Sequence, residues 1–441
     1  MIPQFGPTHW PAPPLPMLNT YAVIALVALL GQYVISVVVD LLNLRAMGQA
    51  LPSEFRDVYD AETYARSQRY ARDRMRFALY PRTFNLALVL GFWFAGGFGW
   101  LQRTVEGLGL GFPLTGLIFL GALMAGQSLL NLPFELYGTF VIEERYGFNR
   151  TTPRTFVTDR LKGAALAVVL GGPFVAMLLA LFERAGAWAW LYCWAASTAL
   201  ILLLQLVAPA WLMPLFMKFT PLQDGELRER IMAYARSVSF PLEKLFVVDG
   251  SRRSSKANAF FTGYGKHRRI GLFDTLLERH DADEVVAIVA HEVGHYKKRH
   301  VVQGMFVSIA HLGLIFFVFG LLLRQPGLYD AFFVSGMPLH AGLVFCALLY
   351  RPLDLVLSLL LLARSRRHEY EADRFAVETT GLGEALARGL QKLARDSLGN
   401  LTPHPSYVLF HHTHPPLRDR VAAIRREAAQ HSTRAHPVSK C

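Results

Sequence analysis

The sequence predicts a mainly α-helical protein that crosses a membrane seven times and carries a small α+β domain outside the bilayer. Two bulk properties support this fold class: 53% of the 441 residues are hydrophobic against 18% charged, and the mean hydropathy is +0.29. Long apolar runs are the third observation, because about 20 apolar helical residues cross the hydrocarbon core. The net charge of +12 does not indicate nucleic-acid binding, since the basic residues lie between apolar runs without aromatic-interleaved basic modules.

Several candidate spans carry residues that are unusual in a membrane helix. Pro113 falls in the third span, and Pro209 and Pro214 fall in or beside the fifth, where proline disfavours a continuous helix. Arg351 and Asp354 lie in the seventh span, and we expect them to face protein or water, as a structural ion pair or a functional one. The seven spans are predicted near residues 18–43, 83–102, 108–130, 163–182, 187–213, 301–323 and 339–363.

The distribution of Lys and Arg predicts the orientation. Eight arginines lie between residues 45 and 82 and five basic residues between 145 and 162, whereas the alternate connections hold only Arg103, Arg184 and Arg324. By the positive-inside rule the basic loops are cytoplasmic. We therefore expect an integral protein of a cell inner membrane or an endomembrane, in contact with the lipid bilayer, with its N-terminus outside.

The chain divides into five predicted regions. The polar part contains a strand at 245–249, a hairpin of 258–262 and 269–273 with Gly263 and Gly265 in its turn, and a helix from about 282 to 299. Asp281 and Glu284 form a capping box at the start of that helix. The regions are a membrane region with five spans (1–213), a cytoplasmic segment (214–300), the last two spans (301–363), a second cytoplasmic segment, helical over 383–426 (364–427), and a disordered tail (428–441).

The helix at 282–299 contains the motif that predicts chemistry, His291-Glu292-Val293-Gly294-His295. Two histidines at i and i+4 lie on one helical face, so both imidazoles can bind one zinc ion. Glu292 lies about 100° around the helix from His291. It can therefore act as the general base of a zinc-dependent hydrolase without being a ligand. His280, His300 and His311 lack this spacing and are interpreted as ordinary polar or helix-end residues.

A catalytic zinc site needs a third protein ligand. Candidates follow the seventh span, where Glu369 and Asp373 share one face if the helix continues into the cytoplasm. Glu369 could then bind the metal while Asp373 orients a ligating histidine. His368 is the rival ligand, and helical geometry alone does not choose between His368 and Glu369. Glu371 is expected to point elsewhere.

Five stretches of the chain, in order, resemble the type I CAAX prenyl protease family, which are integral-membrane gluzincin metallopeptidases. The resemblance implies a seven-span protein whose helices enclose a chamber capped by a zincin-like domain, with one zinc ion per chain and a peptide or protein substrate. The matching stretches are 143–152 (EERYGFNRTT), 255–263 (SKANAFFTG), 291–295 (HEVGH), 369–373 (EYEAD) and 414–420 (HPPLRDR).

Site roles also follow from the resemblance. It selects Glu369 as the third zinc ligand. Asn258 and Ala259 are implied to contact the substrate main chain, His414 to stabilise the oxyanion, and Arg420 to support His414 by pairing with a carboxylate. Packing at the start of a helix is the alternative interpretation of His414 and Arg420. The substrate is implied to be a C-terminally prenylated peptide, or else a membrane or misfolded protein.

Two other classes of protein are compatible with parts of the sequence. A transporter with an incidental metal site would explain the span count, but no inverted repeat is visible. A protein that binds clients without cutting them would need no general base, which the complete His-Glu-x-x-His motif supplies. The three cysteines, Cys193, Cys346 and Cys441, predict neither a disulfide framework nor a cysteine metal site.

Overall fold

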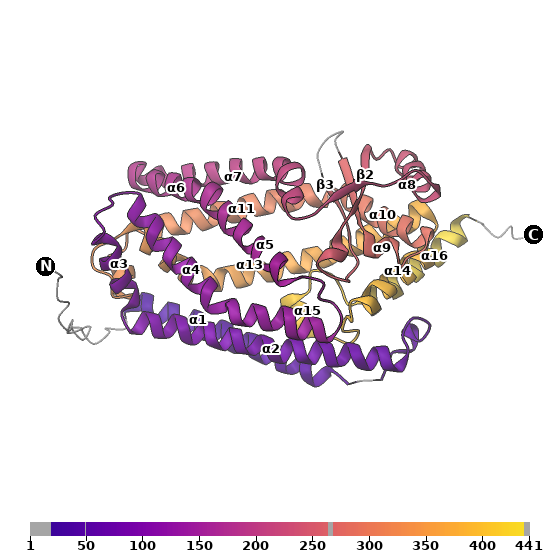
Figure 1. Ribbon diagram of the computed structural model, residues 1–441, viewed down its shortest axis with the longest axis horizontal. Coiled ribbons are helices and arrows are strands. Elements are labelled where there is room, and N and C mark those ends of the chain that lie inside the picture. Colours follow the sequence, from indigo (N-terminus) through magenta and orange to yellow (C-terminus); the bar gives the residue numbers. More distant parts are fainter. Residues whose placement is uncertain (1–18, 49, 263–267, 436–441) are drawn as a thin grey trace, which may run out of the picture.

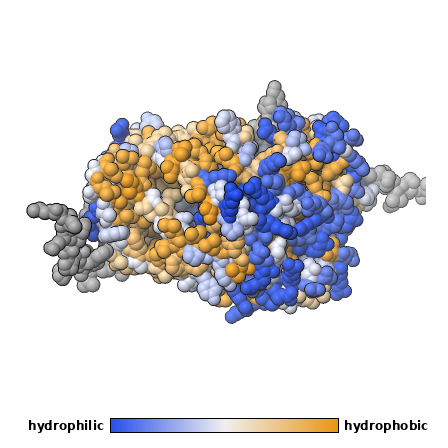
Figure 2. Space-filling view, in the orientation of Figure 1, coloured by the Kyte–Doolittle hydropathy of each residue, from blue (hydrophilic) through white to orange (hydrophobic). Residues whose placement is uncertain are grey.

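The computed structural model of the protein describes residues 19–48, 50–262 and 268–435. Long helices occupy one end of the molecule, and a small sheet with shorter helices occupies the other (Figure 1). Hydrophobic surface covers most of the long helices, and hydrophilic surface dominates around the sheet (Figure 2). The mainly helical fold with a separate polar part is therefore confirmed.

Within the described residues, six helical stretches are long and apolar enough to cross a membrane, and a pair bent by 66° makes a seventh. The predicted set of about seven spans is confirmed. In chain order they are α1 (Thr20–Ala46); α2 (Ala61–Phe94) with α3 (Gly97–Glu106); α4 (Leu114–Tyr137) with the π-helical η2 (Gly138–Glu143); α5 (Pro153–Leu166), η3 (Ala167–Gly171) and α6 (Gly172–Arg184); η4 (Gly186–Trp188), α7 (Ala189–Val207), η5 (Ala208–Leu212) and η6 (Met213–Leu215); α11 (His300–Leu322); and α13 (Leu339–Thr380).

Little of the apolar surface of these spans is covered by protein. The apolar windows of the spans that contain α4, α5, α7 and α11 are at most 6% buried. Large side chains such as Met124, Val168 and Trp211 are 67%, 71% and 75% exposed. Water would solvate so much apolar surface poorly, whereas a bilayer solvates it well, and the backbone groups of a helix are already paired. The protein is an integral membrane protein.

Glycine and proline account for the places where the spans differ from the expected ranges. The third span begins at Leu114, not near residue 108, because Pro113 precedes it and Gly109 and Gly111 have φ of 65° and 68°. The second span bends where Gly96 adopts φ of 71°. Pro209 does not end the fifth span, since the chain continues through it as the π-helical segment η5.

Arg351 and Asp354 contact different neighbouring helices. The Arg351 guanidinium donates to Gln32 Oε1 of α1 at 3.2 Å, and Asp354 Oδ1 lies 3.7 Å from His311 Nε2 of α11. Both residues thus face polar groups of the protein, as expected. They do not form a salt bridge with each other in the described structure, so each charge has a partner on another span.

The sheet contains four strands in the order β1-β2-β4-β3, so β1 and β3 are its edge strands. β2 pairs in parallel with β4, while β1 on β2 and β3 on β4 are antiparallel. The predicted hairpin is the β3–β4 pair, but Gly263 and Gly265 of its turn lie outside the described residues. β3 therefore has one neighbouring strand. The strands are β1 (Phe219–Pro221), β2 (Leu242–Val248), β3 (Ala259–Thr262) and β4 (Arg268–Phe273).

The metal-motif helix is α10 (Ala282–Lys297), and its first turn forms as predicted. Asp281 Oδ1 accepts from the Glu284 amide at 2.9 Å, and the Glu284 carboxylate accepts from the Asp281 amide at 3.3 Å. Val285 and Val289 are fully buried in a core shared with β4 and α13. This burial packs one face of α10 against the sheet, and the two motif histidines face α13.

The C-terminal segment differs from its prediction in two respects. The expected helix over 383–426 is three helices, because 398–404 contains Gly399 and Pro403, 412–416 contains Pro415 and Pro416, and neither stretch continues a helix. The expected disordered tail from 428 is wrong as far as Ala435, because α16 continues to that residue and Ala428 packs on the core. The other elements are η1 (Ser53–Phe55), α8 (Glu226–Ser237), η7 (Gly250–Arg252), α9 (Asp274–Leu277), α12 (Pro326–Asp330), α14 (Gly383–Asp396), α15 (Pro405–His411) and α16 (Leu417–Ala435).

Candidate active site

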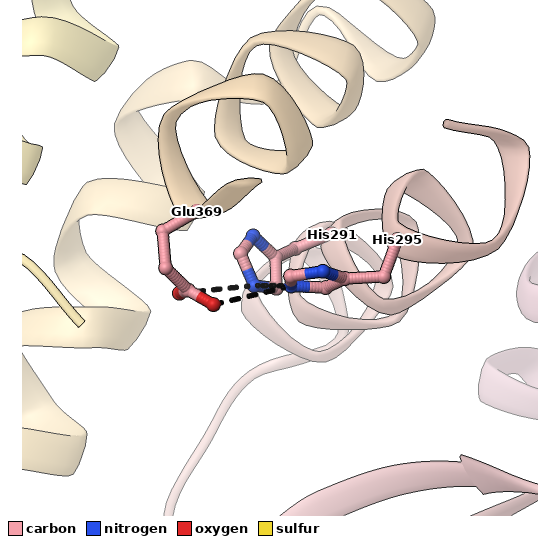
Figure 3. A group of neighbouring side chains, drawn as sticks. All are labelled: His291, His295 and Glu369. Carbon is pink, nitrogen blue, oxygen red and sulfur yellow. Dashed lines mark hydrogen bonds and ion pairs between the residues drawn. The ribbon is translucent and has the colours of Figure 1, made fainter. Parts of the chain in front are cut away.

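His291, His295 and Glu369 direct their polar atoms toward one point (Figure 3). The two histidine Nε2 atoms are 3.1 Å apart. Glu369 Oε1 lies 3.3 Å from His295 Nε2, and Glu369 Oε2 lies 3.7 Å from His291 Nε2. Two nitrogens bound tetrahedrally to zinc, each about 2.0 Å away, would be about 3.3 Å apart. The two nitrogens and one carboxylate oxygen therefore fit a zinc ion in type, number and spacing.

Helix α13 carries Glu369 into this group because it continues far beyond its apolar half, as the sequence predicted. Glu369 is only 4% exposed. The rival His368 lies outside the group and stacks on His300, with ring centroids 3.9 Å apart and planes 2° from parallel. The geometry thus brings Glu369, and not His368, to the two motif histidines.

Asp373 and Arg420 lie behind His291, the first of the two motif histidines. Asp373 Oδ1 lies 2.8 Å from His291 Nδ1, and a carboxylate at this distance favours the tautomer with its proton on Nδ1, which leaves Nε2 free to bind a metal. Arg420 donates to both Asp373 oxygens at 2.9 and 2.7 Å, and its Nη1 lies 3.0 Å from Glu369 Oε2. Burial acts to lower the pKa of Arg420, but the Asp373 carboxylate outweighs it and holds that pKa above its ordinary value.

His295 is held by a second chain of contacts that the sequence interpretation missed. His300 Nδ1 lies 3.1 Å from His295 Nδ1, and His300 Nε2 lies 3.0 Å from Glu371 Oε2. When His300 is neutral, both contacts are hydrogen bonds if His300 carries its proton on Nε2 and His295 carries one on Nδ1. His295 Nε2 is then free for a metal. His300 is therefore more than a helix-end residue, and Glu371 points away from the metal group but supports it.

Glu292 and His414 lie around the same group. The Glu292 side chain is half-buried, and it interacts electrostatically with His291, His295, Glu369 and His414. Burial raises the pKa of Glu292, against the lowering effect of the two motif histidines. His414 Nδ1 lies 2.6 Å from Glu369 Oε2, and its side chain is 62% exposed. His414 is thus placed where it can meet a molecule that approaches from solvent.

Asn258 and Ala259 begin the edge strand β3, beside α10. The Asn258 carbonyl accepts from the Phe273 amide at 3.0 Å, and the Asn258 side chain accepts from the Ala259 amide at 2.9 Å. In an antiparallel pair, alternate residues face the partner strand. Ala259 and Phe261 therefore direct their main-chain groups away from β4, toward the free edge.

Two of the stretches that carry the family resemblance lie against each other. Lys256 Nζ donates to Glu143 at 3.0 Å and to Tyr70 at 2.8 Å, and Tyr70 donates to Glu143 at 2.5 Å. Ser255 Oγ donates to the Gly147 carbonyl at 3.0 Å. Through these contacts the segment before β3 binds to α2 and η2 of the membrane region. They position the edge strand relative to the spans.

Known proteins are similar to this chain in sequence and in fold. A family model described as "CAAX prenyl protease N-terminal, five membrane helices" matches residues 40–218, and the model of peptidase family M48 matches residues 221–428. A CAAX prenyl protease 1 homolog of Arabidopsis thaliana is 36% identical over 402 residues, which cover 89% of this chain and 94% of that protein. The CAAX prenyl protease 1 of Saccharomyces cerevisiae is 34% identical over 400 residues, with 85% and 88% covered.

A solved structure agrees over nearly the whole chain. The crystal structure of S. mikatae Ste24p matches with a TM-score of 0.87 at 32% identity, covering 93% of this chain and 100% of that chain. Fold and site together define an integral-membrane metalloprotease, a hydrolase, and not a transporter or a client-binding protein. The chain belongs to peptidase family M48, among its CAAX prenyl proteases.

Proposed function

We propose that the protein is a zinc-dependent endopeptidase with one zinc ion per chain, held by His291, His295 and Glu369. One observation carries the proposal: two Nε2 atoms and a carboxylate oxygen converge within 4.8 Å of one another. The remaining ring nitrogen of each histidine is engaged elsewhere, with Asp373 and with His300. Such an arrangement directs both free nitrogens to the same point and suits a tetrahedral site with one open position.

Residues of the chain perform the proton transfers of peptide hydrolysis. A zinc ion at this site would act as a Lewis acid that lowers the pKa of a water molecule and polarises the peptide carbonyl. Glu292 takes a proton from the attacking water on its carboxylate and passes it to the leaving amine nitrogen. Burial raises the pKa of Glu292, which makes its carboxylate a stronger base toward the proton of the water.

The surrounding residues bind and orient the substrate. His414 donates a hydrogen bond to the carbonyl oxygen on which negative charge develops. Arg420 positions His414 indirectly, since both contact Glu369 Oε2. Asn258 and Ala259 offer the start of the edge strand β3, to which an extended peptide adds through main-chain hydrogen bonds.

The names of the relatives support a substrate class. The curated proteins of Arabidopsis thaliana and Saccharomyces cerevisiae are named for CAAX prenyl proteolysis. We extend this to C-terminally prenylated peptides as substrates of the chain, with membrane or misfolded proteins as a second class. A prenyl chain is apolar, so the membrane region would bind the lipid while the polar part cuts the peptide.

Orientation and domain roles complete the proposal. The basic loops 45–82 and 145–162 favour a cytoplasmic active site and an external N-terminus. Residues 214–300 and 364–427 together form the protease part, while 1–213 and 301–363 form the membrane part. Protease protection of tags placed at each end, in sealed vesicles, tests this orientation.

The central test compares Glu292→Gln with Glu278→Gln, a matched change at an exposed residue just before α10. Both variants should bind one zinc ion per chain, measured by elemental analysis. Only Glu292→Gln should lose hydrolysis of a prenylated peptide, by at least about 100-fold in kcat. Full activity of Glu292→Gln with zinc bound would remove Glu292 from the reaction and contradict the proposal.

A further inference from the structure

A large basic cavity lies away from the metal group, where the membrane part meets the sheet. Its volume is about 1190 Å³. The first turns of α5, the stretch from η6 to β1 and the loop around η7 line it. Six cationic side chains but one carboxylate, that of Asp159, belong to its lining. The cations are Arg150, Arg154, Lys162, Lys218, Arg252 and Arg253.

Most of this positive charge has no partner in the protein. Arg253 donates hydrogen bonds of 2.9 and 3.2 Å to the two oxygens of the Asp159 carboxylate. Lys162 Nζ donates to the Leu215 carbonyl at 2.7 Å, which leaves its charge uncompensated. The other four cationic side chains form no ion pair with any residue in 19–48, 50–262 or 268–435. So many cations around one cavity would repel one another unless an anion lies between them.

The cavity lies at a membrane surface. Its lining includes the start of the span 153–184 and the end of the span 186–215, and these two ends leave the membrane on the same side because one connection joins the two spans. The cavity is therefore at the level of lipid headgroups. The N-terminus of α5, capped by Thr152, also points its free amides to this level.

Apolar surface continues from the cavity along both spans. Val157 and Leu161 of α5 are 53% and 66% exposed, and Trp211 and Leu215 near the end of the next span are 75% and 47% exposed. A tryptophan at this depth is typical of the membrane interface. A ligand that fits both features has an anionic head for the cavity and hydrocarbon chains for the spans. An acidic peptide or free phosphate would use only the first.

We propose that this basic cavity binds the headgroup of an anionic phospholipid from the adjacent leaflet. The phosphodiester contacts Arg150, Arg154 and Arg252, and the acyl chains lie along the exposed side chains of α5 and η5. Guanidinium groups suit this role because they bind phosphate oxygens in pairs. The bound lipid would hold together the membrane part and the loop that precedes β3.

Binding can be measured on the full-length protein in neutral detergent, with radiolabelled dioleoylphosphatidylglycerol as probe. The variant Arg150→Gln/Arg154→Gln/Arg252→Gln should bind it roughly 100-fold more weakly, from the contribution of each basic residue near an anionic headgroup. The matched control is Arg56→Gln/Arg69→Gln/Arg76→Gln, three exposed arginines in or just before α2, and it should bind as the parent does. The variant Arg150→Lys/Arg154→Lys/Arg252→Lys keeps the three charges and should retain more binding than the Gln variant, whereas equal loss in both would contradict a role for the positive charge.

Competition identifies the ligand. Unlabelled dioleoylphosphatidylglycerol should displace the probe, whereas dioleoylphosphatidylcholine, inorganic phosphate, soluble glycerophosphoglycerol and a polyglutamate peptide should not at the same concentration. Displacement by the soluble phosphates would indicate a phosphate site in place of a lipid site, and displacement by the peptide an acidic-protein site. Either outcome overturns the proposal, as does equal weakening in the control triple.

Discussion

The Nδ1 atoms of His295 and His300 lie 3.1 Å apart, and His300 Nε2 lies 3.0 Å from Glu371. Asp373 lies 2.8 Å from His291 Nδ1 in the same way. Each motif histidine therefore has its own support on the nitrogen that does not face Glu369. The first support is a carboxylate, while the second is a histidine that is itself held by a carboxylate.

The support of His295 can be tested by Glu371→Gln. A glutamine amide can still contact His300, but it carries no charge and does not fix the proton on His300 Nε2. Loss of such a supporting contact lowers metal affinity by about 10- to 100-fold. Zinc affinity is measured by competition with a chromogenic chelator. The control is Glu378→Gln on the same helix, an exposed residue, and an equal drop in both variants would contradict the role of Glu371.

The sequence predicted that the two motif histidines lie side by side because their relation is local. His291 and His295 share a face at i and i+4, so any helix there brings them together. Helical geometry alone did not choose between Glu369 and His368 as the third ligand, and only the family resemblance predicted Glu369. His300 was missed because Arg299 adopts φ of 59°, a left-handed turn that folds the start of α11 back toward α10. Arginine gives no sequence signal for that conformation, whereas glycine would.

Arg420 is expected to be structural as well as supportive. It is 7% exposed and pairs with both Asp373 and Glu369, so its loss removes the one guanidinium that these two buried carboxylates share. Arg420→Met should lower the free energy of unfolding by about 3–5 kcal/mol. Arg420→Lys should recover only part, because an ammonium cannot replace the paired guanidinium contacts. Thermal unfolding in detergent measures both, and Arg426→Met, at an exposed position of α16, is the control.

The contact between Lys256 and Glu143 should affect substrate binding and not the metal. Lys256→Met removes the tie between the segment before β3 and η2, so the edge strand shifts relative to the metal group. A misplacement of this kind lowers kcat/KM by up to about 100-fold. Zinc content should stay at one per chain. Lys244→Met, at an exposed residue of β2, should change neither quantity. Zinc loss in Lys256→Met would show that this contact supports the metal instead.

The membrane spans were predictable because hydropathy is a local property, but the C-terminal segment was not. Its three helices are separated where Gly399 and Pro403, and then Pro415 and Pro416, interrupt the pattern, and α16 extends to Ala435, with Ala428 packed on Gly383. That packing joins residues far apart in the sequence, and composition alone indicated a polar tail. Packing between residues that are distant in the sequence therefore determines whether this segment is helical.

The variant His414→Ala tests whether His414 acts in catalysis or only packs at the start of α16. Its side chain is 62% exposed, so His414→Ala should leave the unfolding midpoint nearly unchanged. If His414 donates to the oxyanion, kcat should fall about 100- to 1000-fold while KM changes little. Steady-state hydrolysis of a prenylated peptide separates the two parameters. His431→Ala, in the second half of α16, is the control. An unchanged kcat in His414→Ala would assign this residue to packing and leave oxyanion stabilisation to other groups.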